Sequence, residues 1–319
     1  MADVETEDGH VPVLAGEVLE FLAPAPGTVQ IDATVGGGGH TERILEASSP
    51  GGRVLGLDAD PAAVARVARR LARFGDRLVL RQANFREIGR VAPAAGFGRV
   101  DGMLFDLGLS SHQLADRERG FSFRATGPLD MRFDTGRGLP ASELLATLDA
   151  AELAALFRRY GEEPFAGRIG RAIEQERRTR PIETADQLAE LVERSVPGTP
   201  RGRRRIHPAT RVFQALRIAV NEELDALEEA LRSSLDLLRP GGRLVVLSYH
   251  SLEDRIVKQF IATERRGCIC PPELPACVCG RAPRLRRIGP SSITPSAEEV
   301  ATNPRSRSAR LRAAERLAA

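Results

Sequence analysis

Long apolar runs are absent from the sequence, which excludes one broad class of protein. No stretch approaches the roughly 20 consecutive apolar residues of a membrane-spanning helix. The chain also opens with M-A-D-V-E-T-E-D-G-H, which is acidic where a secretory signal peptide is basic and then apolar. We therefore expect a cytoplasmic protein that does not associate with a membrane.

Lysine is nearly absent as well, because Lys258 is the single lysine among the 46 basic residues. The preference for arginine extends over the whole chain, so only clusters of arginine are informative. One cluster is Arg201-Gly202-Arg203-Arg204-Arg205, and a second extends from Arg281 to Arg316. The net charge of +3 is too small to indicate a partner, but both clusters are candidate phosphate contacts.

Cysteine is scarce and confined to one segment that reads Cys268-Ile269-Cys270 and then Cys277-Val278-Cys279. In a cytosolic protein such pairs indicate metal or redox chemistry rather than structural disulfides. Four thiolates are a typical tetrahedral ligand set for zinc, although the cysteines of a pair usually have about two to four residues between them. Zinc binding and a proline-rich surface loop with unpaired thiols are both compatible with this pattern.

What the sequence does contain is a regular alternation of short apolar runs and helix-like segments. Its 319 residues, 42% of them hydrophobic, suffice for one large domain with an insertion or for two domains. Strands are expected at 28–32, 53–58, 77–81, 100–106 and 242–248. Helical connections between them, such as 61–74, predict an α/β protein with a parallel, doubly wound sheet.

A long insertion interrupts this alternation. About 100 residues separate the fourth expected strand from a helix, continuous or broken, expected over 209–238, and an ordinary connection is far shorter. Three stretches of the insertion have helical character: 142–160, 163–178 and 184–195. Because ligands of open α/β sheets bind at the carboxyl edge, where the insertion starts, we expect an all-helical lobe that selects the substrate. A lobe that only caps the sheet is the alternative.

The stretch D-A-T-V-G-G-G-G-H-T-E-R-I-L, residues 32–45, places four glycines between the first strand and its helix. A turn whose backbone approaches a ligand favours residues without a Cβ. The P-loop pattern fails because His40 and Thr41 follow the glycines, and G-x-G-x-x-G fails because Thr41 or Glu42 replaces the third glycine. Asp58, at the end of the second strand, suits ribose hydroxyls, which NAD and S-adenosylmethionine share.

Longer motifs follow the fourth and fifth strands. They read D-G-M-L-F-D-L-G-L-S-S-H-Q-L, R-G-F-S-F-R, G-P-L-D-M-R, S-Y-H-S-L-E-D-R-I-V-K and, over residues 207–224, H-P-A-T-R-V-F-Q-A-L-R-I-A-V-N-E-E-L. With these motifs, and with N-P-R-S-R-S-A-R-L-R over residues 303–312, the chain closely resembles a bacterial methyltransferase family. That family uses S-adenosylmethionine to methylate the N4 amine of a cytosine in the decoding centre of 16S ribosomal RNA. The likeness spans nearly the whole chain.

The resemblance implies a fold and a division into domains. The fold is a Rossmann-like class I methyltransferase sheet with an inserted helical substrate-recognition lobe. The cofactor domain comprises residues 1–108 and 208–319, and the lobe comprises residues 109–207. The implied partner is 16S ribosomal RNA within the small ribosomal subunit, and no stable protein partner is inferred.

The resemblance also implies residue roles. The cofactor positions are Gly38, Gly39, His40, Asp58, Phe85, Asp106 and Gln113. The glycine turn with His40 would face the methionine end, Asp58 the ribose and Phe85 the adenine. For Phe85 alone, a core aromatic would otherwise be the better interpretation. Phosphate contacts are expected from Arg203, Arg204, Arg205 and Arg211, unless these are solvated surface charges.

Asp106 is the expected catalytic residue. The N4 amine of cytosine is a poor nucleophile until acceptors hold its hydrogens, and a carboxylate would also stabilise positive charge that develops on nitrogen. Other amine methyltransferases have an Asp/Ser/Asn-Pro-Pro-aromatic motif here, whereas residues 106–111 lack the prolines and the aromatic. Tyr249 or His250 could supply stacking or proton acceptance, and a histidine satisfied by backbone hydrogen bonds is the alternative for His250.

Three other classes of protein share parts of this pattern. A DNA amine methyltransferase would have the same cofactor site and a different substrate. A non-enzymatic RNA-binding protein would need no intact cofactor site, and the presence of Asp58, Asp106 and the Gly-Gly-His turn argues against it. The failed glycine fingerprint argues against an NAD oxidoreductase.

Overall fold

The chain forms two compact units in the computed structural model, which describes residues 12–123, 126–197, 207–268, 270–271 and 273–318. The first unit comprises residues 1–109 and 224–319, and the second comprises residues 110–223. Arg203, Arg204 and Arg205 lie outside the described residues. Within the described part of the chain, every helix is too short or too polar to cross a bilayer.

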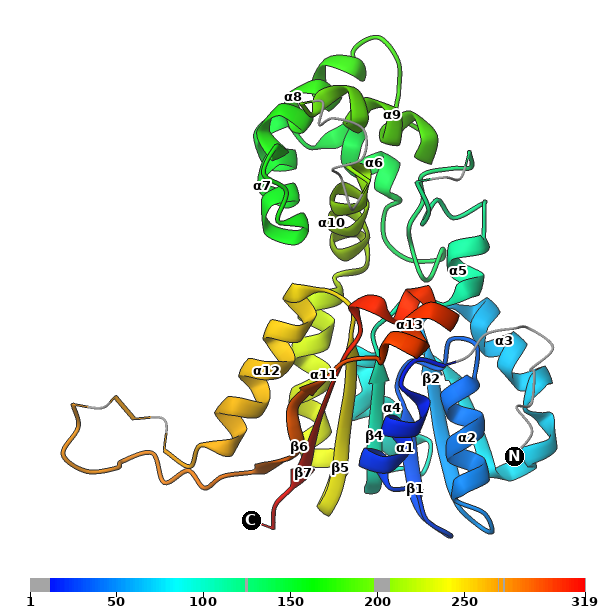
Figure 1. The fold of residues 1–319 in the computed structure, drawn as a ribbon, viewed down its shortest axis with the longest axis vertical. Coiled ribbons are helices and arrows are strands. Elements are labelled where there is room, and N and C mark those ends of the chain that lie inside the picture. The colour runs from blue at the N-terminus through cyan, green and yellow to red at the C-terminus, as the bar shows by residue number, and fades with distance from the viewer. Residues whose placement is uncertain (1–11, 124–125, 198–206, 269, 272, 319) are drawn as a thin grey trace. The chain divides into compact units, whose positions relative to one another are not determined.

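A seven-stranded sheet forms the centre of the first unit, in the order β3-β2-β1-β4-β5-β7-β6 (Figure 1). Its strands are β1 (Val29–Asp32), β2 (Arg53–Asp58), β3 (Leu78–Gln82), β4 (Val100–Asp106), β5 (Leu238–Ser248), β6 (Leu285–Ile293) and β7 (Arg310–Arg316). The first five are parallel to one another, while β7 is antiparallel to β5 and β6. The expected α/β fold and all five expected strands are confirmed.

Strands β6 and β7 were not expected, because their segment was interpreted as an arginine-rich phosphate-binding end. Two of its arginines serve the fold instead. Arg312 is buried and donates two hydrogen bonds to Asp254, at 2.7 and 3.0 Å. Arg316 donates to the backbone oxygens of Leu235 and Arg284. The prediction that this segment contacts phosphate is therefore wrong for Arg312 and Arg316, because their guanidinium groups bind the protein itself.

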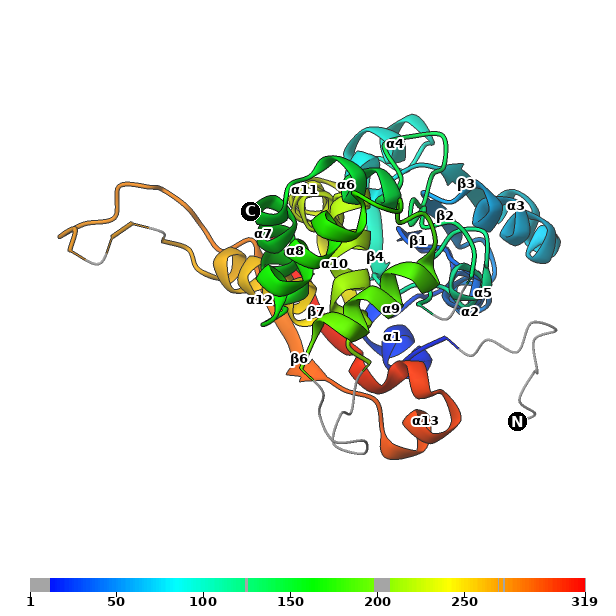
Figure 2. The ribbon, with the colours of Figure 1, turned by 90° about the horizontal axis from the view of Figure 1, so that it is seen from above.

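Helices cover both faces of the sheet, which explains the apolar runs in β2, β4 and the second half of β5. The helices of this unit are α1 (Ala15–Leu22), α2 (Gly39–Ala47), α3 (Pro61–Arg70), α4 (Ile88–Ala94), α11 (Glu223–Leu237), α12 (Ser251–Arg265) and α13 (Ala297–Thr302), with short 3-10 turns at Ala72–Arg77, Phe85–Glu87 and Pro304–Ser308. Figure 2 shows α4, α11 and α12 on one face and α1, α2 and α3 on the other. Successive side chains of β4 alternate between the faces: Leu104 packs with α1 and α2, and Phe105 with α11 and α12.

The second unit is helical. It contains α5 (Ser111–Ala115), α6 (Ala141–Thr147), α7 (Ala150–Gly161), α8 (Ala166–Glu176), α9 (Ala185–Ser195) and α10 (Ala209–Asn221). The helix expected over 142–160 is divided where Asp149 caps α7 through the amides of Ala151 and Glu152. The helix expected over 209–238 is broken at Glu222, whose φ is 50°.

Helix α10 belongs to this helical unit, so the unit ends at Glu223 and not at the expected boundary after residue 207. The reason is close packing of backbones. A Cβ on Gly161 of α7 would lie 2.5 Å from the backbone oxygen of Arg211 in α10. A Cβ on Gly170 of α8 would likewise lie 2.5 Å from the backbone oxygen of Ala150 in α7. Glycine at these two positions lets α7 contact both neighbouring helices.

We expect Gly170→Ala to destabilise the helical unit by about 1–2 kcal/mol, because overpacking outweighs the gain in helix propensity. Gly167→Ala is the matched control: it is in the same helix, and its new Cβ would meet the flexible ends of Arg158, at 3.1 Å, and Arg171, at 3.8 Å. The control should be neutral or slightly stabilising. Urea denaturation followed by circular dichroism, with hydrogen exchange of the α7 and α8 amides, measures both. Equal effects of the two substitutions would contradict the close contact.

Candidate active site

Three carboxylates end neighbouring parallel strands: Asp32 ends β1, Asp58 ends β2 and Asp106 ends β4. Because the strands are parallel, all three lie at the carboxyl edge of the sheet. Strand order reverses between β1 and β4, since β2 and β3 extend to one side of β1 and β5 to the other side of β4. This is the switch point at which open α/β sheets bind their ligands.

The glycine turn after β1 is held in place by Asp58. The amide of Gly36 donates to Asp58 Oδ2 at 2.8 Å, and Gly36 and Gly38 have φ of 53° and 81°, a region that favours glycine. Helix α2 starts directly after Gly38, and no side chain among the described residues caps it. The first backbone N–H groups of α2 are therefore positioned for a carboxylate or another anion.

Asp58 is partly buried beneath this turn. Its other oxygen, Oδ1, accepts from the amide of Asp60 at 2.9 Å. Burial raises the pKa of Asp58 to about 6, although the two backbone hydrogen bonds act in the opposite direction. Each carboxylate oxygen still has a lone pair for a further donor. Asp58 can thus order the turn and accept a ligand hydroxyl at the same time.

Asp32 and Thr34 connect the start of the glycine turn to β4. Asp32 is buried and accepts from Thr41 Oγ1 at 2.6 Å and from the amide of Thr34 at 3.1 Å. Burial raises the pKa of Asp32, against the effect of Thr41. The hydroxyl oxygen of Thr34 accepts from the amide of Asp106 at 2.6 Å. This network fixes the backbone from which the Asp106 side chain projects.

The Asp106 carboxylate contacts two ring side chains. The Tyr249 hydroxyl donates to Asp106 Oδ1 at 2.7 Å, and His40 Nε2 lies 3.6 Å from Oδ2. A Cβ on Gly108 would lie 2.6 Å from the Tyr249 ring, so glycine lets the phenol cross the strand end. Burial, followed by the charge of Asp106, raises the pKa of Tyr249 well above 10, which keeps the phenol protonated as a donor.

His40 is neutral at physiological pH, because burial lowers its pKa to about 4. Its Nε2 is buried and makes no hydrogen bond within the part of the chain that the structure describes. A buried polar atom without a partner is costly. A bound ligand with a polar group beside Asp106 would satisfy it, so this atom fits a cofactor site.

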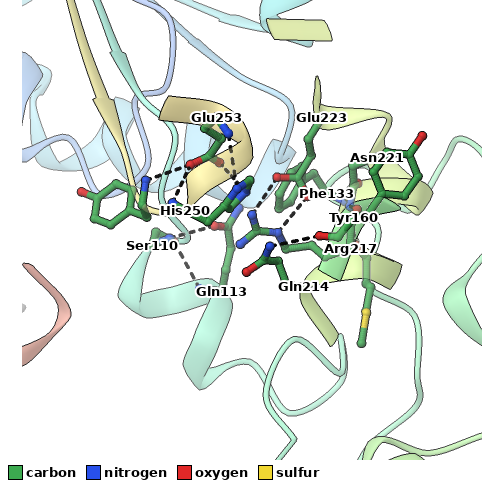
Figure 3. A network of polar contacts seen from close by, with 12 residues as sticks. Ser110, Gln113, Phe133, Tyr160, Gln214, Arg217, Asn221, Glu223, His250 and Glu253 are labelled. Carbon is green, nitrogen blue, oxygen red and sulfur yellow. Dashed lines mark hydrogen bonds and ion pairs between the residues drawn. The ribbon is translucent and has the colours of Figure 1, made fainter. Parts of the chain in front are cut away.

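Glu253 holds the residues that follow β5, as Figure 3 shows. Its Oε2 accepts from the amides of Tyr249 and His250, at 2.8 and 3.3 Å. In return, His250 Nδ1 accepts from the Glu253 amide at 3.4 Å, which caps the N-terminus of α12. The His250 ring is therefore engaged by backbone, as the alternative interpretation of this histidine expects.

Phe85 lies just beyond β3, in the 3-10 turn that Asn84 caps. Its ring meets the buried Phe105 edge to face, with centroids 6.0 Å apart, while Phe85 itself is only partly buried. It therefore contributes to the core and still presents ring surface. The role in adenine binding and the role in packing are compatible.

The second unit carries the other expected residues. Gln113 lies in α5, where its side-chain oxygen accepts from the Ser110 amide at 2.9 Å. Asp130 and Arg132, in the G-P-L-D-M-R motif, form an ion pair with each other at 2.7 and 2.8 Å. Arg211 is exposed on α10.

A polar network joins two motifs within this unit (Figure 3). Asn221 Nδ2 donates to the backbone oxygen of Met131 at 2.7 Å, and the Phe133 amide donates to Asn221 Oδ1 at 2.8 Å. Arg217 forms two hydrogen bonds of 2.8 Å with Glu223. The G-P-L-D-M-R stretch and the end of α10 are thus fixed to each other.

Sequence reasoning missed Asp32, Thr34, Thr41 and Glu253, and it did not foresee that Tyr249 donates to Asp106. A usable signal existed for Asp32, which ends an apolar strand directly before the glycine turn. No comparable signal pairs Tyr249 with Asp106, because 143 positions separate them.

The comparisons with known proteins identify the family of the chain. The model of the MraW methylase family matches residues 7–317. A relative from Thermomicrobium roseum, named Ribosomal RNA small subunit methyltransferase H, is 60% identical over 97% of this chain and 94% of its own length. Relatives of the same name from Heliobacterium modesticaldum and Syntrophotalea carbinolica are 51% and 53% identical, over 97% of this chain and 98% of their own length. The chain therefore belongs to the MraW methylase family.

Proposed function

We propose that the chain transfers a methyl group from S-adenosylmethionine to the N4 amine of a cytosine in the decoding centre of 16S ribosomal RNA, within the small ribosomal subunit. Family membership supports methyl transfer, the names of the relatives support ribosomal RNA of the small subunit as the substrate, and the resemblance of the motifs supports the N4 amine of a cytosine. The observation that carries the proposal is the Asp106 carboxylate at the switch point, oriented by Tyr249 and adjacent to the neutral His40.

The residues around the glycine turn fit this cofactor. The uncapped N-terminus of α2, at Gly38, Gly39 and His40, suits the carboxylate of its amino-acid end. Asp58 would accept from the ribose hydroxyls, and the exposed part of Phe85 would lie against the adenine. Gln113 is assigned to the cofactor by family resemblance. When bound, S-adenosylmethionine supplies an electrophilic methyl group on a sulfonium.

Asp106 is the proposed acceptor for the target amine. Its carboxylate would accept a hydrogen bond from N4, which turns the nitrogen lone pair away from the ring and toward the methyl group. As the carbon–nitrogen bond forms and the carbon–sulfur bond breaks, positive charge develops on N4, and the adjacent carboxylate stabilises it. Tyr249 fixes the carboxylate, while His250 caps α12 and is given no proton-transfer step.

The helical unit is the proposed RNA-recognition domain. Arg211 is exposed on α10 and would contact phosphate, as would Arg203, Arg204 and Arg205. A cytosine within folded RNA must leave its stack to reach a strand edge, so contacts with the flanking phosphates would help to hold it there.

Tritium transfer from labelled S-adenosylmethionine to 30S particles from a strain without the enzyme tests the proposal. We expect the wild type to label 16S RNA and duplex DNA to remain unlabelled. In Asp106→Asn, kcat should fall by about 100-fold or more, because a stabilising charge is lost. Asp76→Asn, at an exposed carboxylate, is the control and should be fully active. A wild type that binds the cofactor but labels duplex DNA, or labels nothing, would contradict the proposal.

Tyr249→Phe removes the hydroxyl that orients Asp106 and leaves the ring in place. A hydrogen bond to a charged group contributes about 1.5–3 kcal/mol, so we expect kcat to fall by roughly 10- to 100-fold. The Kd for S-adenosylmethionine, measured by calorimetry, should change far less. An unchanged kcat would show that the Tyr249 hydroxyl contributes only to folding.

The affinity for S-adenosylmethionine should depend on pH through Asp58. Its pKa of about 6 means that the free protein carries a carboxylate at pH 7 and a neutral acid at pH 5. The carboxylate is the better acceptor for ribose hydroxyls, so Kd should rise as pH falls below about 6, by up to about tenfold per unit. Calorimetry from pH 5 to 8 measures this. Asp58→Asn should bind more weakly and without that rise, and an equally steep rise in this variant would exclude Asp58 as its source.

A further inference from the structure

The segment between α12 and β6 lies apart from the cofactor edge. Figure 1 shows it in orange, as an excursion beyond the end of α12. Its base is closed by the buried Glu264, which accepts hydrogen bonds from Arg281 and, at 2.6 Å, from Arg284 Nε. The Arg284 amide also donates to the backbone oxygen of Glu264 at 2.8 Å. The two ends of the excursion are thus fixed side by side.

Beyond this base the described side chains have little apolar burial. Val278 is 78% exposed and Leu274 is 44% exposed. Segments without a core usually need a covalent or metal cross-link to hold one conformation. The four cysteines are the residues of this excursion that can supply one.

The four thiols converge in the structure. The Sγ atoms of Cys268, Cys270, Cys277 and Cys279 all lie within 4.8 Å of one another. Two of the separations are 3.5 Å, between Cys277 and Cys279, and 3.9 Å, between Cys279 and Cys268. A disulfide requires about 2.05 Å. Sulfur atoms at the corners of a zinc tetrahedron with bonds of about 2.3 Å are about 3.8 Å apart, which matches the separations observed here.

Backbone also lies against the first sulfur, because the Cys270 amide donates to Cys268 Sγ at 3.4 Å. Arg266 precedes the first cysteine by two residues, whereas Arg281, which follows the last by two, is already paired with Glu264. Only one residue separates the two cysteines of each pair, so the loop between the two ligands is shorter than usual. The four sulfur atoms nevertheless converge.

We propose that Cys268, Cys270, Cys277 and Cys279 bind one zinc ion as a closed tetrathiolate site. With four protein ligands no position is open to a substrate, so the ion is structural and holds the excursion that presents Leu274 and Val278. Binding releases the thiol protons and involves no redox step. The site is independent of methyl transfer, so its test does not depend on the activity of the enzyme.

Metal analysis of the full chain, purified under reducing conditions from zinc-supplied cells, tests the proposal. We expect about one zinc per chain. The double variant Cys277→Ser/Cys279→Ser should retain less than about a tenth of that amount, since two ligands are lost. Val278→Ala, between these cysteines, is the matched control and should keep its zinc. Circular dichroism establishes that each variant is folded.

A second measurement uses the unaltered chain. Cobalt added to the metal-free protein should give the ligand-field and sulfur charge-transfer bands of a tetrahedral tetrathiolate, and one equivalent of zinc should abolish them. Wild-type protein that holds no zinc and takes up none in titration would overturn the proposal. So would iron as the resident metal, zinc retained by the double variant, or a mass that shows disulfides among the four cysteines.

Discussion

The parallel pairing of β1 with β4 is the constraint on which the site depends. It places Asp32 beside Leu104, so that the turn after β1 and the end of β4 start from adjacent backbone. Two hydrogen bonds continue this contact past the strands: the Ala33 amide donates to the Leu104 oxygen, and the Asp106 amide donates to Thr34. Neither the glycine turn nor Asp106 could have its present position if this register were shifted, because a slip of one residue would turn each side chain to the other face.

Much of the fold could be predicted from local pattern. Strands β1, β2, β4 and the second half of β5 are largely buried and therefore form apolar runs that the sequence displays directly, while β3 is only partly buried. Strands β6 and β7 escaped notice because they are rich in arginine, and some of these arginines pair within the protein. The place of α10 in the helical unit depends on close backbone contact at Gly161, and the packing of α7 on α8 on close contact at Gly170, which only the packed helices reveal.

The site was predicted unevenly for a related reason. Asp58, Asp106 and the Gly-Gly-His turn follow strands directly, so strand ends and family motifs locate them. The donor to Asp106 comes from the residue after β5, and its approach depends on the absence of a side chain at Gly108. For His250 the sequence suggests a role that the structure does not support. Its position next to Tyr249 suggests catalysis, whereas its ring caps a helix. Such roles are set by tertiary geometry and not by residue type.

The three carboxylates at the switch point also bear on what happens after the reaction. Asp32 lies close enough to Asp58 and to Asp106 for their charges to interact, so negative potential is concentrated at this edge. A sulfonium cofactor is positively charged at sulfur, whereas the thioether left by methyl transfer is neutral there. With the cofactor at the proposed site, this acidic edge would attract the substrate form more strongly than the spent form. The charges that would help the cofactor to enter would cease to hold it once the methyl group had gone, which would favour release of the product and the start of another turnover.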